Sequence, residues 1–273
     1  MGNESNPQVF SNRWADAVGP GGVESPRDHC RCIQHGSGAQ APTRFHPERQ
    51  DTTAPGWIRL LELVEEAAAD GREVFKPLVE LTAQERRQVV TLPPTIAKLT
   101  SVRHLVLYGS NLVRVPPEIG AMKSLEEFTP YTSYRLHWFP YELTRCLDLS
   151  RSTVSTRALY GNPKRRPPFP SLSDGTAAGL RGVDPEDLDP EVWGATAIRT
   201  CSVCDRPLQG ADLHRVWISL RTSGADVLPL LVNACSTACV EALPTPADGY
   251  ARTPHTGGPH TGGRPDTARP SAG

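Results

Sequence analysis

The stretch that decides the fold runs from Val89 to Leu143 and reads VVTLPPTIAKLTSVRHLVLYGSNLVRVPPEIGAMKSLEEFTPYTSYRLHWFPYEL. Leu92-Pro93, Val115-Pro116 and Phe139-Pro140 stand in it at intervals of 23 and then 24 residues. Apolar residues recur three, six and nine positions after each of these prolines: Ile96, Leu99 and Val102, then Ile119, Met122 and Leu125, then Leu143, Cys146 and Leu149. A period of this length indicates repeated units that must stack on one another to bury their apolar edges.

The pattern resembles the leucine-rich repeat in its 23-residue form, L-x-x-L-x-L-x-x-N-x-L-x-x-L-P, and the resemblance covers residues 88–162. The phrase LPPTIAKLTSVRHLVL is a close match, whereas the second unit has one extra residue and a proline in its strand. The resemblance implies an α/β leucine-rich repeat solenoid of about three repeats with a helical N-cap. It also implies that Cys146 occupies a leucine position in the core.

The same alignment implies which side chains form the concave face of the sheet, because the leucines of each strand point inwards and the residues between them point outwards. The partner-binding residues expected from it are Arg103, His104, Val106, Tyr108, Glu127, Thr129, Tyr131 and Arg151. Tyrosine, histidine and arginine together are typical of a recognition surface. The resemblance therefore implies a non-enzymatic protein–protein interaction scaffold, and a solvated sheet face without a ligand is the alternative.

Helical signals precede the repeats. In WIRLLELVEEAAA, residues 57–69, apolar residues recur at helical spacing, and Gly71 can end the helix. Thr82 and Glu85 have the spacing of a capping box, which predicts the start of a second helix. We therefore predict a helical N-cap over residues 56–87 and a disordered tail over residues 1–55, which are rich in Gly, Pro, Ser and charge.

Four cysteines suggest a metal site in the C-terminal part of the chain. TCSVCDRPLQG contains Cys201 and Cys204, and Cys235 and Cys239 follow after 30 intervening residues that hold two apparent strands. Two cysteine pairs around a hairpin fit tetrahedral zinc, and the layout resembles a treble-clef or zinc-ribbon module of the four-cysteine type. Disulfides, unpaired thiols and a redox-active pair are alternatives, although no βαβ unit or long helix accompanies the first pair.

Four thiolates would close the coordination shell, so the predicted zinc is structural rather than catalytic. The module is predicted over residues 196–247 and is too small to build a sufficient apolar core alone, so that zinc binding would supply the missing stability. Residues 163–195 are predicted to be a Pro-rich and acidic linker. Residues 248–273, which contain PHTGGPHTGG, are predicted to be a disordered tail.

Composition and motif searches exclude several other classes. The net charge of −1 argues against bulk electrostatic binding to nucleic acid or anionic membranes. No apolar run reaches 18 residues, and no phosphate-binding or nucleophile motif occurs. The N-terminus lacks the pattern of a secretory signal, and we expect a cytoplasmic protein. The alternative function is nucleic-acid binding through the zinc module, using Arg199, Arg206, Arg215 and Arg221 with Trp217.

Overall fold

The structure is a computed structural model that describes residues 46, 48–152, 154, 159–161, 169–172, 183, 185–193, 196–208, 213–223, 226–250 and 252–257. Residues 1–45 and 258–273, which make up most of the two predicted tails, lie outside the described residues. The same holds for much of the predicted linker.

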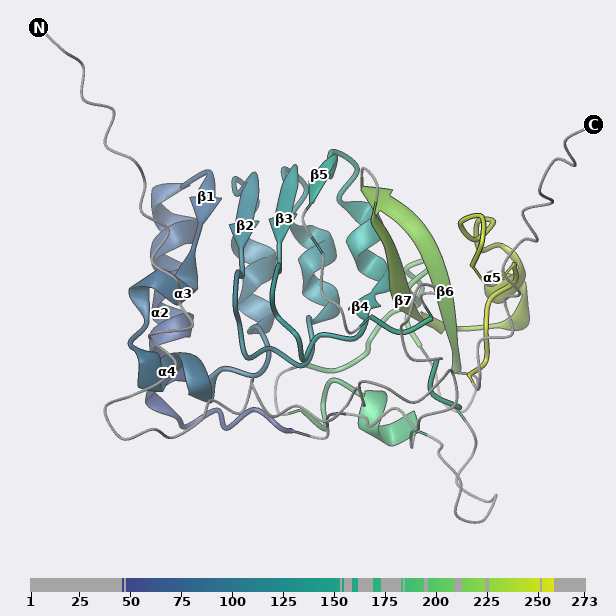
Figure 1. Ribbon diagram of the computed structural model, residues 1–273, viewed down its shortest axis with the longest axis horizontal. Helices are drawn as coiled ribbons and strands as arrows, with labels where there is room; N and C mark the ends of the chain where they lie inside the picture. Colours follow the sequence, from purple (N-terminus) through teal and green to yellow (C-terminus); the bar gives the residue numbers. More distant parts are fainter. Residues whose placement is uncertain are drawn as a thin grey trace, which may run out of the picture.

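Four short strands form a parallel sheet in the order β1-β2-β3-β5, and Figure 1 shows them side by side. They are β1 (Val74–Phe75), β2 (His104–Val106), β3 (Glu127–Thr129) and β5 (Arg151–Ser152). The register pairs His104 with Glu127, and Glu127 with Arg151. Paired residues in these neighbouring strands are therefore 23 and 24 positions apart, the same intervals that separate the three prolines of the pattern.

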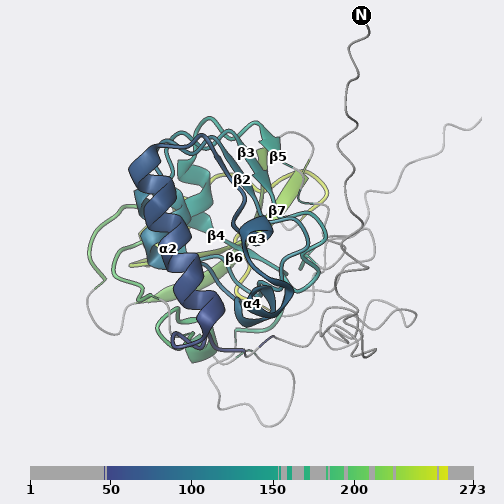
Figure 2. The same ribbon diagram turned by 90° about the vertical axis from the view of Figure 1, so that its left-hand side faces the viewer.

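Helical segments cover one face of this sheet. They are α2 (Pro55–Asp70) and the 3-10 helices η1 (Pro94–Lys98), η2 (Pro117–Ala121) and η3 (Tyr141–Arg145). Figure 1 and Figure 2 show these helices as one layer that lies behind the sheet. Each 3-10 helix directly follows a proline of the repeated pattern, which caps it in an extended conformation. In η1 and η2 a second proline, Pro94 or Pro117, occupies the first helical position, where its fixed φ is near the helical value and its missing N–H would be unpaired anyway. The core lies between the two layers, where Ile96, Leu105, Ile119 and Phe128 are fully buried.

The N-terminal helices follow their sequence signals. α2 includes the predicted 57–69 helix and stops at Gly71, whose φ of 64° is the left-handed conformation that glycine favours. The predicted capping box is confirmed at the start of α4 (Ala83–Gln88), where Thr82 and Glu85 accept each other's backbone N–H groups. α3 (Pro77–Glu80) lies between these helices in the sequence. In the part of the chain described here, none of the helices has both the length and the apolar character that crossing a bilayer requires.

A second sheet joins distant parts of the chain in the order β4-β7-β6. Its strands are β4 (Phe139–Pro140), β6 (His214–Ser223) and β7 (Asp226–Ala234), and α5 (Thr237–Glu241) follows β7. β6 and β7 form an antiparallel hairpin, while β4 pairs in parallel with Leu230 and Leu231 of β7. Ile218 packs into the main core and Trp217 into an aromatic cluster with Trp138 and Phe169, so the hairpin is buried on both faces.

The prediction of a leucine-rich repeat solenoid of about three repeats with an appended zinc module is wrong. The described residues form a four-stranded parallel sheet and a mixed three-stranded sheet with few helices. The expected regularity breaks at the third proline mark, where Phe139 and Pro140 pair with the hairpin of the cysteine region. The hairpin buries its apolar residues against the part of the chain that contains Phe139 and Pro140. A separately folded module could not bury them there. Cys146 is 4% exposed, so its predicted place in the core is confirmed.

Two buried arginines hold outlying segments against the two sheets. Arg114 is 2% exposed, donates to the carbonyl groups of His46 and Glu48, and lies 4.6 Å from the ring centroid of Trp193. Arg135 is 7% exposed and forms an ion pair with Glu48. Because a buried guanidinium needs partners to offset its lost hydration, these contacts fix the segments around residues 48 and 193.

Candidate metal centre and sheet face

The first cysteine pair lies in a tight turn. Thr200 and Pro207 form an isolated bridge, and inside it the N–H of Cys201 donates to the carbonyl of Arg206 over 2.8 Å. The residue after Cys204 is Asp205, which adopts a φ of 61° and donates its N–H to the carbonyl of Cys201. Metal-binding turns commonly place glycine at such a position, and aspartate is among the few other residues that tolerate it. The absence of glycine here therefore does not change the geometry of the turn.

The second pair flanks the start of α5. Cys235 directly follows β7, and Cys239 lies within the helix, where Ser236 caps the backbone N–H of Cys239 with its hydroxyl at 3.2 Å. The hairpin of β6 and β7 brings this segment back beside the first turn, since the backbone groups of Ser202 and Asn233 are hydrogen-bonded.

The four cysteines meet at metal-ligand distances. The sulfur atoms of Cys201, Cys204, Cys235 and Cys239 all lie within 4.8 Å of one another. The Cys204–Cys235 and Cys235–Cys239 sulfur distances are both 3.6 Å. Four sulfurs at a zinc–sulfur distance of about 2.3 Å in a tetrahedron stand roughly 3.8 Å apart, whereas a covalent disulfide measures about 2.0 Å. The predicted ligand set is thus brought together as a group that could hold a metal ion.

Backbone N–H groups shape the electrostatics of the site. Val203 and Cys235 each donate to the sulfur of Cys201 over 3.4 Å. Burial alone would raise the pKa of Cys201, but N–H groups, including that of Cys204, outweigh it and lower the pKa to about 7. The pKa of Cys235 is raised to about 12, because its thiol is hydrogen-bonded to the sulfurs of Cys239 and Cys204. Sulfurs close enough to share protons are also close enough to share one cation.

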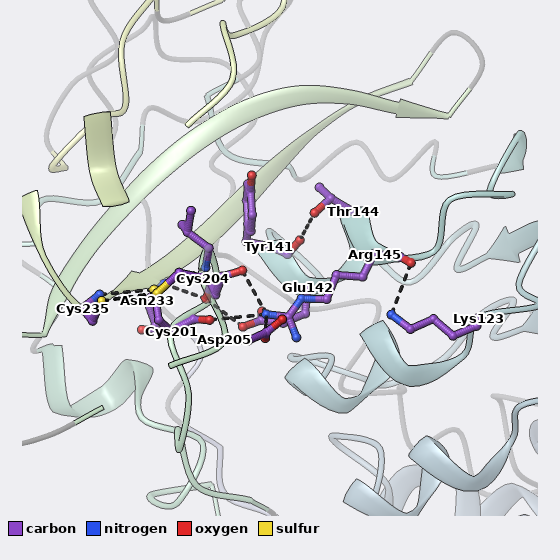
Figure 3. A network of polar contacts seen from close by, with 12 residues as sticks. Lys123, Tyr141, Glu142, Thr144, Arg145, Cys201, Cys204, Asp205, Asn233 and Cys235 are labelled. Atoms are coloured by element: carbon purple, nitrogen blue, oxygen red, sulfur yellow. Dashed lines mark hydrogen bonds and ion pairs between the residues drawn. The ribbon is translucent and has the colours of Figure 1, made fainter. Parts of the chain in front are cut away.

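A buried polar contact ties the cysteine turn to η3, as Figure 3 shows. Ser202 donates its hydroxyl to the Glu142 carboxylate over 2.7 Å and accepts the N–H of Asn233 over 3.0 Å. Arg145 donates to the carbonyl of Ser202 over 3.0 Å and forms an ion pair with Asp205 at 2.5 Å. These contacts therefore anchor the four-cysteine group to the layer of 3-10 helices.

Sequence reasoning missed Glu142, whose side chain is only 5% exposed. Burial raises its pKa, the hydrogen bond from Ser202 opposes this, and Glu118 contributes by repulsion. Glu118 stands 24 positions earlier, also two residues after a proline of the pattern, so the repeat itself contained the signal that these two carboxylates influence each other.

We predict that Glu142→Gln stabilises the protein at neutral pH. The folded-state pKa of Glu142 lies above its ordinary 4.5, so the stability it contributes is present below that value and is lost as pH rises through the raised pKa. Glutamine keeps an oxygen that accepts from Ser202 and removes the buried charge. Urea denaturation at pH 5 and pH 8 should show a smaller difference for the variant, and a gain of about 1 kcal/mol at pH 8.

Glu142→Ala provides the control, because it removes the acceptor of Ser202 as well as the charge. It should destabilise the protein at both pH values by about 1–3 kcal/mol. Equal pH dependence of wild type and Glu142→Gln would contradict the prediction.

The predicted partner-binding residues lie on the face of the parallel sheet that the helices do not cover. Leu105 and Phe128 point into the core, so the alternating His104, Val106, Glu127 and Thr129 point outwards. Two further predicted residues, the strand-end Tyr108 and Tyr131, stack their rings at a centroid distance of 5.7 Å. His104 contacts the Thr129 hydroxyl at 3.0 Å.

Charged side chains gather at the other end of these strands. Glu126 forms ion pairs with Arg103 at 2.5 Å and with Arg151 at 3.4 Å, and Arg103 lies 4.0 Å from Glu73. The signs alternate across the sheet, so each charge is next to an opposite one. The uncharged residues Val106, Thr129, Tyr108 and Tyr131 occupy the remaining end of the face.

Two of the residues considered for nucleic-acid binding, Arg215 and Trp217, are engaged within the fold. Trp217 is fully buried against Phe169 and Trp138, so its ring offers no base-stacking platform. Arg215 lies 3.7 Å from Asp189 in an ion pair. Arg199 and Arg206 are exposed, but the exposed Asp205 is adjacent to Arg206.

No protein-family model matches this sequence, and a search of curated proteins finds none that is similar.

Proposed function

We propose that this chain is a non-enzymatic protein-interaction scaffold that binds its partner on the outer face of the four-stranded sheet and holds one structural zinc ion at the four cysteines. The observation that carries the proposal is the division of that face into a self-paired charged end and an uncharged aromatic end. The four-cysteine group supports the proposal, because a zinc ion held there would stabilise the C-terminal end of the fold.

Zinc is the proposed ion because four cysteine sulfurs within 4.8 Å of one another suit its usual structural ligand set. All four positions are supplied by protein, which leaves none for substrate or water, and a structural role follows. Thiols kept available for a metal also suit a reducing compartment such as the cytoplasm.

The ion ladder of Glu73, Arg103, Glu126 and Arg151 is poorly suited to drive binding. Exposed ion pairs contribute about 1 kcal/mol or less, and these charges already have partners. We assign these charges to the edge of the proposed interface, where they help to orient the partner and disfavour a partner whose surface carries mainly one sign of charge.

The tyrosine pair is the proposed centre of the interface. Tyr131 is 36% exposed, and its stacked position on Tyr108 gives a rigid aromatic platform of little conformational entropy. Tyrosines of this kind dominate binding energy in protein interfaces, and neighbouring small residues such as Val106 and Thr129 leave room for a partner side chain.

Photocrosslinking from the sheet face tests this function. Benzoylphenylalanine placed at position 131 should form specific adducts in cells, whereas the same group at Ile58, 47% exposed on α2, should not form them. Replacing Tyr108 and Tyr131 together with alanine should weaken binding of the identified partner by about 2 kcal/mol, roughly 30-fold in Kd.

A matched variant with Ile58 and Val79 replaced by alanine removes apolar surface elsewhere and should keep the affinity within twofold. Identical adducts from both crosslinking positions, or unchanged affinity of the tyrosine variant, would remove the sheet face as the binding site.

A further inference from the structure

The outer edge of β6 is paired with a later segment of the chain. β6 has β7 on one side only, and on the other side Trp217 exchanges both backbone hydrogen bonds with His255, each with an N–O distance of 2.5 Å. Further along the edge, the N–H of Ala247 donates to the carbonyl of Ser219 over 3.0 Å. The segment thus adds to the sheet edge in the manner of a bound extended peptide.

The side chains around His255 form a selective site. Its imidazole lies 5.3 Å from the ring of Phe169, which is itself stacked at 5.8 Å on the indole of Trp217. The imidazole Nδ1 accepts the N–H of Gly257 over 2.9 Å, which closes a turn two residues long. Histidine at this position therefore provides both the stacking ring and the acceptor.

Only glycine fits two positions after the histidine. Gly257 has a φ of 112°, and a Cβ there would stand 2.2 Å from the backbone nitrogen of Leu172 and 2.6 Å from the carbonyl oxygen of Pro170. Both atoms belong to backbone, so they cannot be moved aside as a flexible side chain could. The contacts consequently select a histidine followed two positions later by a glycine, through one ring, one turn and one close backbone approach.

The chain carries this sequence twice. Residues 254–258 and 259–263 both read Pro-His-Thr-Gly-Gly, so His260 and Gly262 repeat the two residues that the site selects. Counted from the anchor at Ala247, the connecting loop would have seven residues for the first copy, 248–254, and twelve for the second, 248–259. Loop-closure entropy separates loops of these lengths by only about twofold in population.

We propose that the edge of β6 at Trp217, with Phe169 and residues 170–172, is a peptide-binding groove for the sequence Pro-His-Thr-Gly-Gly, occupied in turn by the two copies in this chain. The loop sets a high effective concentration of both copies, so exchange within one molecule outcompetes binding between molecules. The groove is an edge site separate from the sheet face proposed for the partner, and its existence does not depend on that function.

Histidine NMR on the full-length protein tests the proposal. Ring currents from Phe169 shift the Cε1–H resonance of a docked histidine, and His255→Gln and His260→Gln assign the two resonances. Wild type should show both histidines partly docked, with His255 favoured by about two to one. In Gly257→Val the added side chain blocks the first copy, and His260 should become fully docked.

Gly262→Val is the matched variant and alters only the second copy, which leaves the docked first copy intact. It should make His255 fully docked and abolish any docked signal from His260. The double variant should show neither histidine docked, and an added acetyl-PHTGG-amide peptide should then give a saturable docked signal of its own. A resonance of His260 that stays at the undocked position in Gly257→Val, or a His255 signal that Gly262→Val does not change, overturns the proposal.

Discussion

Cys204→Ser should lower bound zinc from about one equivalent per chain to less than a fifth and should destabilise the protein by about 4 kcal/mol or more, because loss of a structural metal is among the largest single-site effects. The sulfur of Cys204 lies 3.6 Å from that of Cys235, so it belongs to the ligand group. Removing one thiolate opens the shell that ties the first turn to α5. Metal analysis after gel filtration and a thermal melt measure both effects.

Cys146→Ser is the matched control for that experiment. Cys146 is buried and donates its thiol to the carbonyl of Ile119 over 3.4 Å, outside the metal group. Serine can keep the hydrogen bond, so zinc content should stay near one equivalent and stability should fall by about 1–2 kcal/mol. Wild-type zinc content in Cys204→Ser, or equal loss of zinc from both variants, would exclude the four-cysteine site.

Gly120→Ala is the second change for which we expect a large effect, of about 2–3 kcal/mol destabilising. A Cβ at Gly120 of η2 would lie 2.6 Å from the backbone oxygen of Glu142 and 2.9 Å from its Cβ. η2 and η3 would have to separate, and that movement would disturb the contact between Glu142 and Ser202. Guanidinium denaturation of the zinc-loaded protein gives the measurement.

The preceding 3-10 helix provides the comparison. Ala97 stands 23 positions before Gly120, at the same place in η1, so the contact between η1 and η2 already accommodates a Cβ. Ala97→Gly should therefore cost only about 0.5–1 kcal/mol. Many glycine-to-alanine changes stabilise a protein. A neutral or stabilising Gly120→Ala would show that the two helices are not in close backbone contact.

Local signals predicted local structure well in this chain. The capping box of Thr82 and Glu85 and the stop at Gly71 formed where the sequence placed them, since both depend on a few neighbouring residues. The four cysteines could also be predicted as a group, because cysteine spacing around a hairpin restricts which sulfurs can meet. Burial of Cys146 followed from its place in the apolar period.

Long-range pairing could not be predicted in the same way. β4 is only two residues long and contains proline, so neither alternation nor propensity marked it as a strand that would pair with β7. The buried Arg114 had no sequence signal, because its partners are carbonyl groups and an aromatic ring far away in the chain. The solenoid prediction failed for this reason: periodicity indicates which residues are buried but not what covers the last unit.

The pairing of β4 with β7 also has a consequence for modularity. The segment with β6 and β7 provides two strands of a sheet whose third strand, β4, comes from another part of the chain. This segment therefore cannot be cut out, or transferred to another protein, as an independently folding domain. A transfer of the hairpin into a new gene would have to include Phe139 and the residues around it, or the new protein would have to offer a similar strand for β7 to pair with. Sequence drift in either partner is thereby restricted by the other, and the two halves are expected to evolve as a single inherited unit.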